Sequence, residues 1–211
     1  MGIIEDVGLQ YLAPFGYPYF GYPYIERCFA MAKLPDPTIL PLSPDLQETY
    51  NELVSKRGHI YDLYRSLLNH PEIAKHIGDL GSFLRFGAGV LPGSVRELVI
   101  LLVARRIGAA YEWVMHVREA IKEGIPKNVI EAIRTGKEPH DLDRIQQLAL
   151  AAVQYVLDRQ PIPQSIQDEL IKTVGLKGVV ELVVLCGFYQ MIATVIFAFD
   201  VPLPDGETYP F

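Results

Sequence analysis

From residue 43 onward, apolar residues recur three and four positions apart along the chain, which is the spacing of an amphipathic α-helix. The first three helices are predicted over residues 43–58, 59–69 and 71–87, with Pro71 in the first turn of the third. No segment alternates apolar and polar residues in the way that a half-buried strand does. The pattern therefore predicts an all-α fold, a bundle of about eight helices packed on one another.

The centre of the chain contains the helix pair around which we expect the bundle to be built. The first helix, Ser94–Ile107, is apolar almost all round, so it is predicted to be buried on most sides. Gly108 predicts a tight turn, and the second helix carries Glu112 and His116 one turn apart. With Trp113 facing the core, these two residues fall on a flanking stripe. On this stripe Glu112 and His116 could form the wall of a cleft, and they could equally face solvent.

The later part of the chain completes the predicted bundle. Pro126 starts a short helix, Asp141 is expected to cap a longer one that ends at Arg159, and two more cover residues 163–174 and 179–199. The last of these is apolar and long enough for a membrane span. Its internal polar residues and the lack of flanking basic residues favour a core helix, so no membrane partner is expected.

Residues 1–41 differ from the rest and are predicted to form an extended Tyr/Pro-rich arm ahead of a single domain over residues 42–211. The sequence FGYPY occurs twice, at 15–19 and 20–24, and its prolines disfavour a helix or a central strand. Aromatic surface of this size is expected to be covered. The arm lies on its own subunit, embraces another subunit or closes an active site. We expect a homo-oligomer with Tyr17–Tyr24 contributing to an interface.

A weak internal repeat relates two of the apolar helices. The segment VRELVIL at Val95 is echoed by VVELVVL at Val179, and the glutamates Glu97 and Glu181 are 181 − 97 = 84 residues apart. A duplicated, two-part bundle would produce this echo. The same offset places Asp200 opposite His116, so only the first half would keep an acid together with an imidazole.

Charge and cysteine content limit the classes of function. The chain has 19 basic and 25 acidic residues, a net charge of 19 − 25 = −6, without a basic cluster, so a nucleic-acid partner is not expected. Cys28 and Cys186 are far apart and in no metal-binding or redox spacing. The first ten residues contain acids where a secretion signal needs basic residues, and we expect a cytoplasmic protein with reduced thiols.

Three side chains in the central helix pair are candidates for chemistry. Glu97 follows Ser94 by three residues, the spacing of a capping box, and by itself this favours a structural role. Glu112 and His116 share a helix face, where a carboxylate orients an imidazole and raises its pKa; the alternative is a surface ion pair. Because only one of the five histidines belongs to this cluster, a metal site is the less favoured interpretation, and neither a metal nor another cofactor is expected.

The stretch RELVILLVARRIGAAYEWVMHVREAIKEGI resembles the signature region of the carboxymuconolactone decarboxylase family, which has the all-α fold of the alkylhydroperoxidase-like proteins. The similarity runs from His70 to Ile133, and residues 181–206 are similar to the C-terminal part of the two-part members. The peroxidase branch of this fold uses a Glu, a Cys-x-x-Cys pair and a His. The matching positions in this chain are Glu97, Ala109, Glu112 and His116.

Because both cysteines of the pair are missing, thiol peroxidase activity is not expected. The resemblance instead implies loss of CO2 from a small carboxylated unsaturated lactone or a related keto acid, without a cofactor. In that reaction His116 acts as the acid or base, Glu112 orients it and Glu97 is a second carboxyl group in the pocket. The candidates for contacts with the substrate and its carboxylate are Arg85, Arg96 and Trp113.

Two alternatives remain open at this level. One is a binding or scaffold protein that keeps the fold as an oligomer without the chemistry, and the other is a proton-transfer isomerase. The catalytic reading requires Glu97 to meet His116. In an antiparallel helix pair, Glu97 is expected opposite residues 118–122, about one turn beyond His116 at 1.5 Å per residue. A long carboxylate side chain can span much of this gap, so we predict that Glu97 meets Glu112 and His116 at an enclosed pocket.

Overall fold

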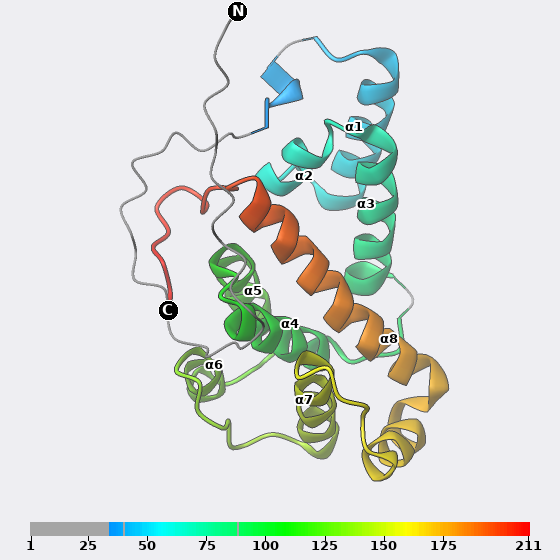
Figure 1. Cartoon of the computed structure of the whole chain (residues 1–211), viewed down its shortest axis with the longest axis vertical. Helices are drawn as coiled ribbons and strands as arrows, with labels where there is room; N and C mark the ends of the chain where they lie inside the picture. The colour runs from blue at the N-terminus through cyan, green and yellow to red at the C-terminus, as the bar shows by residue number, and fades with distance from the viewer. Residues whose placement is uncertain (1–33, 40, 88) are drawn as a thin grey trace, which may run out of the picture. The chain divides into compact units, whose positions relative to one another are not determined.

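The computed structural model describes residues 34–39, 41–87 and 89–211. Within these residues every regular element is helical, which confirms the all-α prediction (Figure 1). Most of the aromatic arm, including both FGYPY copies, Cys28 and the expected interface Tyr17–Tyr24, lies outside the described residues. The elements are η1 (Pro37–Ile39), α1 (Pro44–Arg57), α2 (Asp62–Leu67), α3 (Pro71–Phe86), α4 (Gly93–Ile107), α5 (Ala110–Lys122), α6 (Lys127–Arg134), α7 (Arg144–Leu157) and α8 (Gln164–Ala198).

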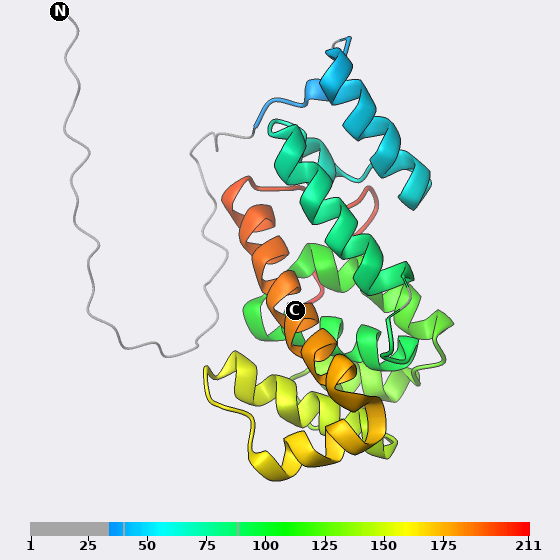
Figure 2. The ribbon, with the colours of Figure 1, turned by 90° about the vertical axis from the view of Figure 1, so that its right-hand side faces the viewer.

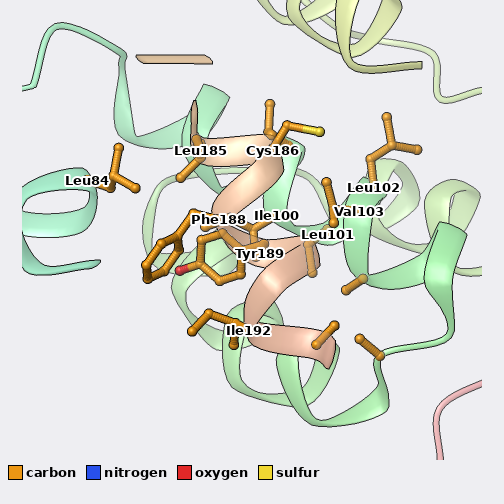
Figure 3. Packing of buried hydrophobic residues seen from close by; sticks show 14 of the residues in the cluster. Leu84, Ile100, Leu101, Leu102, Val103, Leu185, Cys186, Phe188, Tyr189 and Ile192 are labelled. Atoms are coloured by element: carbon orange, nitrogen blue, oxygen red, sulfur yellow. The ribbon is translucent and has the colours of Figure 1, made fainter. Parts of the chain in front are cut away.

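Helix α4 lies at the centre of the bundle and packs against α5, α6, α7 and α8. Its apolar residues from Leu98 to Ala104 are all buried, as its almost uniformly apolar sequence predicts. Figure 3 shows Ile100–Val103 of this helix beside Leu185 and Ile192 of α8. Neighbouring helices cover this part of α4 on several sides, which explains why its residues from Leu98 to Ala104 are apolar.

The turn between α4 and α5 has the predicted form. Gly108 adopts a left-handed backbone conformation, with φ of 72° and ψ of 24°, which a residue with a side chain adopts at an energetic cost. The amide of Ala109 then donates to the carbonyl of Ala104 at 2.8 Å and closes the end of α4. This short connection lays α5 along α4, so that side chains of the two helices face each other.

Helix α8 combines the two helices expected at the end of the chain. Gly175, with φ of 70° and ψ of 174°, interrupts its regular geometry, and Figure 2 shows the bend. An 18-residue stretch of α8 has a mean hydropathy of 2.1 and half of it is buried inside the protein, which is typical of a core helix as well as of a membrane span. The second part of α8 packs on α4 and carries Tyr189 into the interior.

Two element boundaries differ from the sequence prediction. Residues 59–61 do not join α2, which begins only at Asp62 after Tyr61 in an extended conformation. Asp141 has a positive φ of 63°, so it cannot cap α7. Asp143 does so instead: its carboxylate accepts the amide of Gln146 at 2.9 Å, and the Gln146 side chain accepts the amide of Asp143 at 3.0 Å, a capping box.

The end of the expected arm is not extended where the structure describes it. Pro37–Ile39 form a single 3-10 turn, and the carboxylate of Asp36 accepts the amide of Thr38 at 2.8 Å. Asn69, after α2, donates from its side-chain amide to the carbonyl of Pro35 at 2.8 Å. This turn is therefore held on the helical domain, although it lies ahead of the predicted boundary at residue 42.

Candidate active site

His116 of α5 and Glu97 of α4 meet directly in the interior. Nδ1 of His116 lies 2.6 Å from Oε2 of Glu97, and the two residues are only 3% and 6% exposed. The capping-box prediction for Glu97 is wrong: α4 begins at Gly93 after Pro92, without a side-chain cap. Glu97 thus lies a full turn inside the helix, on the face toward α5.

The other imidazole nitrogen also faces polar groups. Nε2 of His116 lies 3.4 Å from Oε2 of Glu112, one turn earlier on α5, and 3.1 Å from the hydroxyl of Tyr189 on α8. The predicted one-turn gap between Glu97 and His116 is closed, because a long carboxylate side chain reaches across it. The structure therefore brings together all three residues that the sequence assigns to catalysis, and adds the tyrosine.

The two carboxylates set the charge of the imidazole. Burial lowers the pKa of His116, but the charge of Glu97 and the hydrogen bonds with Glu112 and Glu97 outweigh this effect and raise the pKa above its ordinary value of 6.5. The two carboxylates therefore favour the protonated form of the imidazole. An imidazolium held between two carboxylates is equipped to donate a proton to a bound molecule.

A pocket opens beside this cluster, between side chains of α1, α2, α3, α5 and α8. Its free volume is about 40 Å³, room for a few water molecules. A larger ligand would need side chains to move. The imidazole of His116 and the Glu112 carboxylate form one part of the wall. Most of the remaining wall is aromatic or aliphatic: Tyr61, Tyr64, Tyr111, Met115, Phe188 and Ile192.

Arg85 of α3 lines the same pocket as a cation without an anionic partner. Among the described residues it makes no ion pair within 4 Å, and its buried Nε finds no hydrogen-bond partner. Burial lowers its pKa, but the nearby Tyr189, Glu97 and Glu112 outweigh this and raise it, so the guanidinium stays charged. A half-buried, unpaired guanidinium in a pocket is the arrangement expected for binding a carboxylate.

The guanidinium of Arg57, at the end of α1, also lines the pocket. Its Nη2 donates to the carbonyl of Gly78 at 3.0 Å, and its plane lies over the ring of Tyr64, 4.3 Å from the centroid. Its Nε is buried without a hydrogen-bond partner among the described residues. Burial lowers the pKa of Arg57, and the charge of Arg85 adds to this effect, so an anion bound nearby would relieve both cations.

The structure does not bring Arg96 or Trp113 into the pocket. Arg96 donates from Nη1 to the carbonyl of Leu91 at 3.1 Å, and Trp113 is buried with its ring edge-on to Phe211, the centroids 5.2 Å apart. Each is next to a site glutamate in the sequence, Arg96 before Glu97 and Trp113 after Glu112. A single step along a helix turns a side chain by about 100°. These two substrate contacts are therefore withdrawn: Arg96 is structural, and Trp113 belongs to the core.

Two pocket residues, Arg57 and Tyr189, were not singled out from the sequence. Arg57 is the last residue of α1, where a basic side chain is ordinary, and Tyr189 is one polar group in an apolar helix. Nothing local distinguishes either of them, because their place in the site depends on the packing of α1 and α8 onto the rest. A buried tyrosine hydroxyl that needs a hydrogen-bond partner is the one available clue.

Glu181 and Cys186 are both buried but do not line the pocket. Glu181, which corresponds to Glu97 in the weak repeat, is buried on α8 and accepts the amide of Val90 at 2.8 Å, so it holds the loop before α4. Cys186 does not line the pocket, and burial raises the pKa of its thiol to about 11. It is therefore an unreactive core residue. In the part of the chain described, no three His, Cys, Asp or Glu side chains are arranged to hold a metal ion.

The comparisons with known proteins agree with this site. Residues 71–154, which include α3, α4 and α5, match the model of the carboxymuconolactone decarboxylase family. This part of the chain is therefore similar to that family, and the resemblance predicted from the sequence is confirmed. The match and the fold together suggest an enzyme that modifies small molecules. No protein with a curated description matches the chain.

Solved structures with the same fold include two of the debrominase Bmp8. The chain aligns with its apo form at a TM-score of 0.63 and 13% identity, over 82% of this chain and 91% of that one. A cysteine-to-alanine variant of Bmp8 in complex with 2,3,4-tribromopyrrole gives a TM-score of 0.64 and 13% identity, over 84% and 92%. An uncharacterized peroxidase-related protein from Silicibacter sp. TM1040 gives 0.66 and 17%, over 84% and 94%. At these identities the likeness confirms the alkylhydroperoxidase-like fold.

Proposed function

We propose that the protein is a cofactor-independent acid/base lyase that removes CO2 from a small carboxylated unsaturated lactone or a related keto acid. The observation that carries the proposal is the presence of two groups in one pocket: the guanidinium of Arg85, which makes no ion pair with a described residue, and the imidazole of His116, which lies between two carboxylates. The first suits a substrate carboxylate. The second suits the proton that must be added when CO2 leaves. The match of residues 71–154 to the family model supports this reaction class.

The residues divide the chemistry as follows. Loss of CO2 leaves an electron pair that spreads into a conjugated carbonyl, and the resulting enolate then takes a proton at carbon. The imidazolium of His116 is the source of this proton, and Glu97, at 2.6 Å, holds the ring and stabilises its charge. Glu112 steadies the second nitrogen. The aromatic wall excludes water, which strengthens these electrostatic effects.

A survey of CO2 release tests the proposed reaction. Unsaturated lactones and β-keto acids, each with and without a carboxylate, are incubated with the protein and CO2 is quantified over time. The proposal expects release from at least one carboxylated lactone or keto acid, and competitive inhibition by an unreactive compound that carries the same carboxylate. If no member of the panel loses CO2 faster than it does without protein, the decarboxylase assignment fails.

One observation favours a second candidate, a binding protein without turnover. The free volume beside His116 is small, about 40 Å³, and each imidazole nitrogen already faces a protein group. A protein of this kind would bind carboxylates at Arg85 in the same survey without releasing CO2. A proton-transfer isomerase would instead exchange carbon-bound hydrogen with D2O, also without CO2, so the same samples separate the three functions.

Assembly and location stay predictions. We expect a homo-oligomer, and the exposed apolar side chains along α8 support it, since isolated subunits seldom leave such a stripe in water. Light scattering at micromolar concentration tests this expectation, and a monomer would contradict it. A cytoplasmic location remains the expectation from the composition alone. The exposed residues on α8 are Leu176, Val180, Val183, Val184, Met191 and Phe197.

A further inference from the structure

Tyr189 joins the acid/base cluster from a helix that the family match does not include. Its hydroxyl lies 3.1 Å from Nε2 of His116, and its ring stands edge-on to the imidazole, with centroids 5.0 Å apart and planes at 89°. The residue is 4% exposed and lines the pocket. Figure 3 shows its hydroxyl among Phe188, Ile192 and the residues of α4. Tyr189 thus contacts the imidazole and, like His116, lines the space open to a ligand.

When His116 is protonated, the hydroxyl hydrogen of Tyr189 is free to form a hydrogen bond with another group. In the imidazolium, Nδ1–H donates to Glu97 and Nε2–H donates to the Tyr189 oxygen, with Glu112 as a more distant acceptor at 3.4 Å. The phenol then has its own O–H to donate. It has no second hydrogen-bond partner among the described residues, and a buried donor of this kind is expected to find one. A ligand in the pocket is well placed to supply it.

We propose that Tyr189 is the catalytic residue that delivers the proton to the substrate, and that His116 replaces this proton at once. The proposal rests on the proposed function. As the C–C bond to CO2 breaks, its electron pair passes into the conjugated carbonyl. The enolate carbon then takes the hydrogen of the Tyr189 O–H group, and the phenol oxygen takes the Nε2 hydrogen of His116. This leaves a neutral imidazole with Nδ1–H on Glu97, and water restores the lost proton.

The environment of Tyr189 favours transfer of both protons together. Burial raises the pKa of Tyr189 well above its ordinary value, although the charge of Arg85 opposes this. A free tyrosinate is therefore unfavourable at this position. Since the phenol oxygen already accepts the Nε2 hydrogen, it can gain one proton as it loses the other. Direct donation from His116 would require Nε2 to turn away from both Tyr189 and Glu112.

The test compares Tyr189→Phe with the matched control Tyr155→Phe. Tyr155, on α7, is 39% exposed and lies outside the pocket, so its variant is expected to keep the rate of the unmodified protein. Removing the hydroxyl of Tyr189 keeps its ring and its packing. We expect kcat for CO2 release to fall by about 10²- to 10⁴-fold, the usual contribution of a general acid, with KM nearly unchanged.

The number of protons that move in the rate-limiting step distinguishes a catalytic role of Tyr189 from a merely structural one. In mixtures of H2O and D2O, the unmodified protein should give a curved dependence of rate on deuterium content, because two protons move together. Tyr189→Phe should give a straight line for its residual rate. If Tyr189→Phe keeps full kcat, or if the unmodified protein gives a straight line, the proposal is overturned while the decarboxylase assignment stands.

The same variants distinguish failure of the proposal from failure of the proposed function. Exchange of carbon-bound hydrogen in keto carboxylates with D2O needs the proton transfer without the loss of CO2. If the unmodified protein exchanges hydrogen but releases no CO2, and Tyr189→Phe abolishes the exchange, the role of Tyr189 is supported and the decarboxylase assignment fails. Should neither CO2 release nor exchange occur with any compound, both are overturned.

Discussion

The imidazole of His116 and the carboxylate of Glu97 lie 2.6 Å apart in the interior, although they belong to different helices and are separated by 19 residues. The contact depends on the short turn at Gly108, which lays α5 along α4. It couples the charge of His116 to the packing of the two central helices. The stability of the fold and the acidity of the site are therefore linked through a single pair.

Replacing Glu97 by Gln should lower the pKa of His116. The substitution removes the negative charge that outweighs the effect of burial, so the neutral imidazole becomes favoured. Titration of the His116 C2 proton by NMR measures this change, with Glu131→Gln as the control, because Glu131 is an exposed partner of Arg134. Glu97→Ala should also cost about 3–5 kcal/mol of stability, as expected when one partner of a buried pair is removed.

Stability should depend on pH through His116. Because its pKa in the folded state is raised above 6.5, the native protein binds the proton more tightly than the unfolded chain does. The resulting stabilisation is fully present below about pH 6.5 and is lost as pH rises through the raised pKa. Urea unfolding measured from pH 6 to pH 9 should show this decline. His116→Asn should flatten it, and an unchanged slope in that variant would assign the decline to other groups.

Arg85→Met should separate binding from stability. If the guanidinium holds a substrate carboxylate, its loss should raise KM by about 30- to 1000-fold, the equivalent of about 2–4 kcal/mol for a charged hydrogen-bonded pair. The free protein should be as stable as before or more so, since an unpaired, half-buried cation is removed. Arg96→Met is the matched control, because Arg96 bonds to the Leu91 carbonyl away from the pocket. Equal KM values for the two variants would remove Arg85 from the site.

Adding a methyl group at Gly81 should close the pocket. A Cβ at this position would lie 2.9 Å from both Nη2 of Arg57 and Cζ of Phe188, so these side chains must shift into the free space. We expect weaker binding of carboxylated ligands by calorimetry and a loss of about 1–3 kcal/mol of stability from overpacking. Gly187→Ala on α8 meets nothing within 4 Å and should stabilise its helix by about 0.5–1 kcal/mol. Unchanged ligand affinity in Gly81→Ala would place the ligand elsewhere.

The helical fold could be predicted from the sequence because its determinants are local. Pro44 and Pro71 begin helices, Gly58 and Gly108 end them, and the spacing of apolar residues defines their faces. The capping of α7 was misplaced by two residues because Asp141 and Asp143 both suit an N-cap. Only the backbone conformation, left-handed at Asp141, distinguishes them.

The site was predicted in part, and the missing part has a physical reason. Glu112 and His116 share a helix face, so their proximity follows from spacing alone. The contact of Glu97 with His116 was expected only through a long side chain, because hairpin geometry fixes the register to within about a turn. Arg57 and Tyr189 enter from α1 and α8, and their positions depend on tertiary packing. Arg96 and Trp113 were proposed as substrate contacts because they adjoin site glutamates in the sequence, but neither lines the pocket. For Trp113, the expected position toward the core is the one that the structure shows.

The most direct test of the account is the rate of CO2 release by His116→Asn relative to the unmodified protein, with a carboxylated lactone or keto acid on which the latter is active. Circular dichroism first confirms that the variant is folded at the assay temperature, since His116 is buried between two carboxylates. The account predicts a loss of about 10²- to 10⁴-fold in kcat. An equal rate in the folded variant, or no CO2 release from any compound by the unmodified protein, would contradict it.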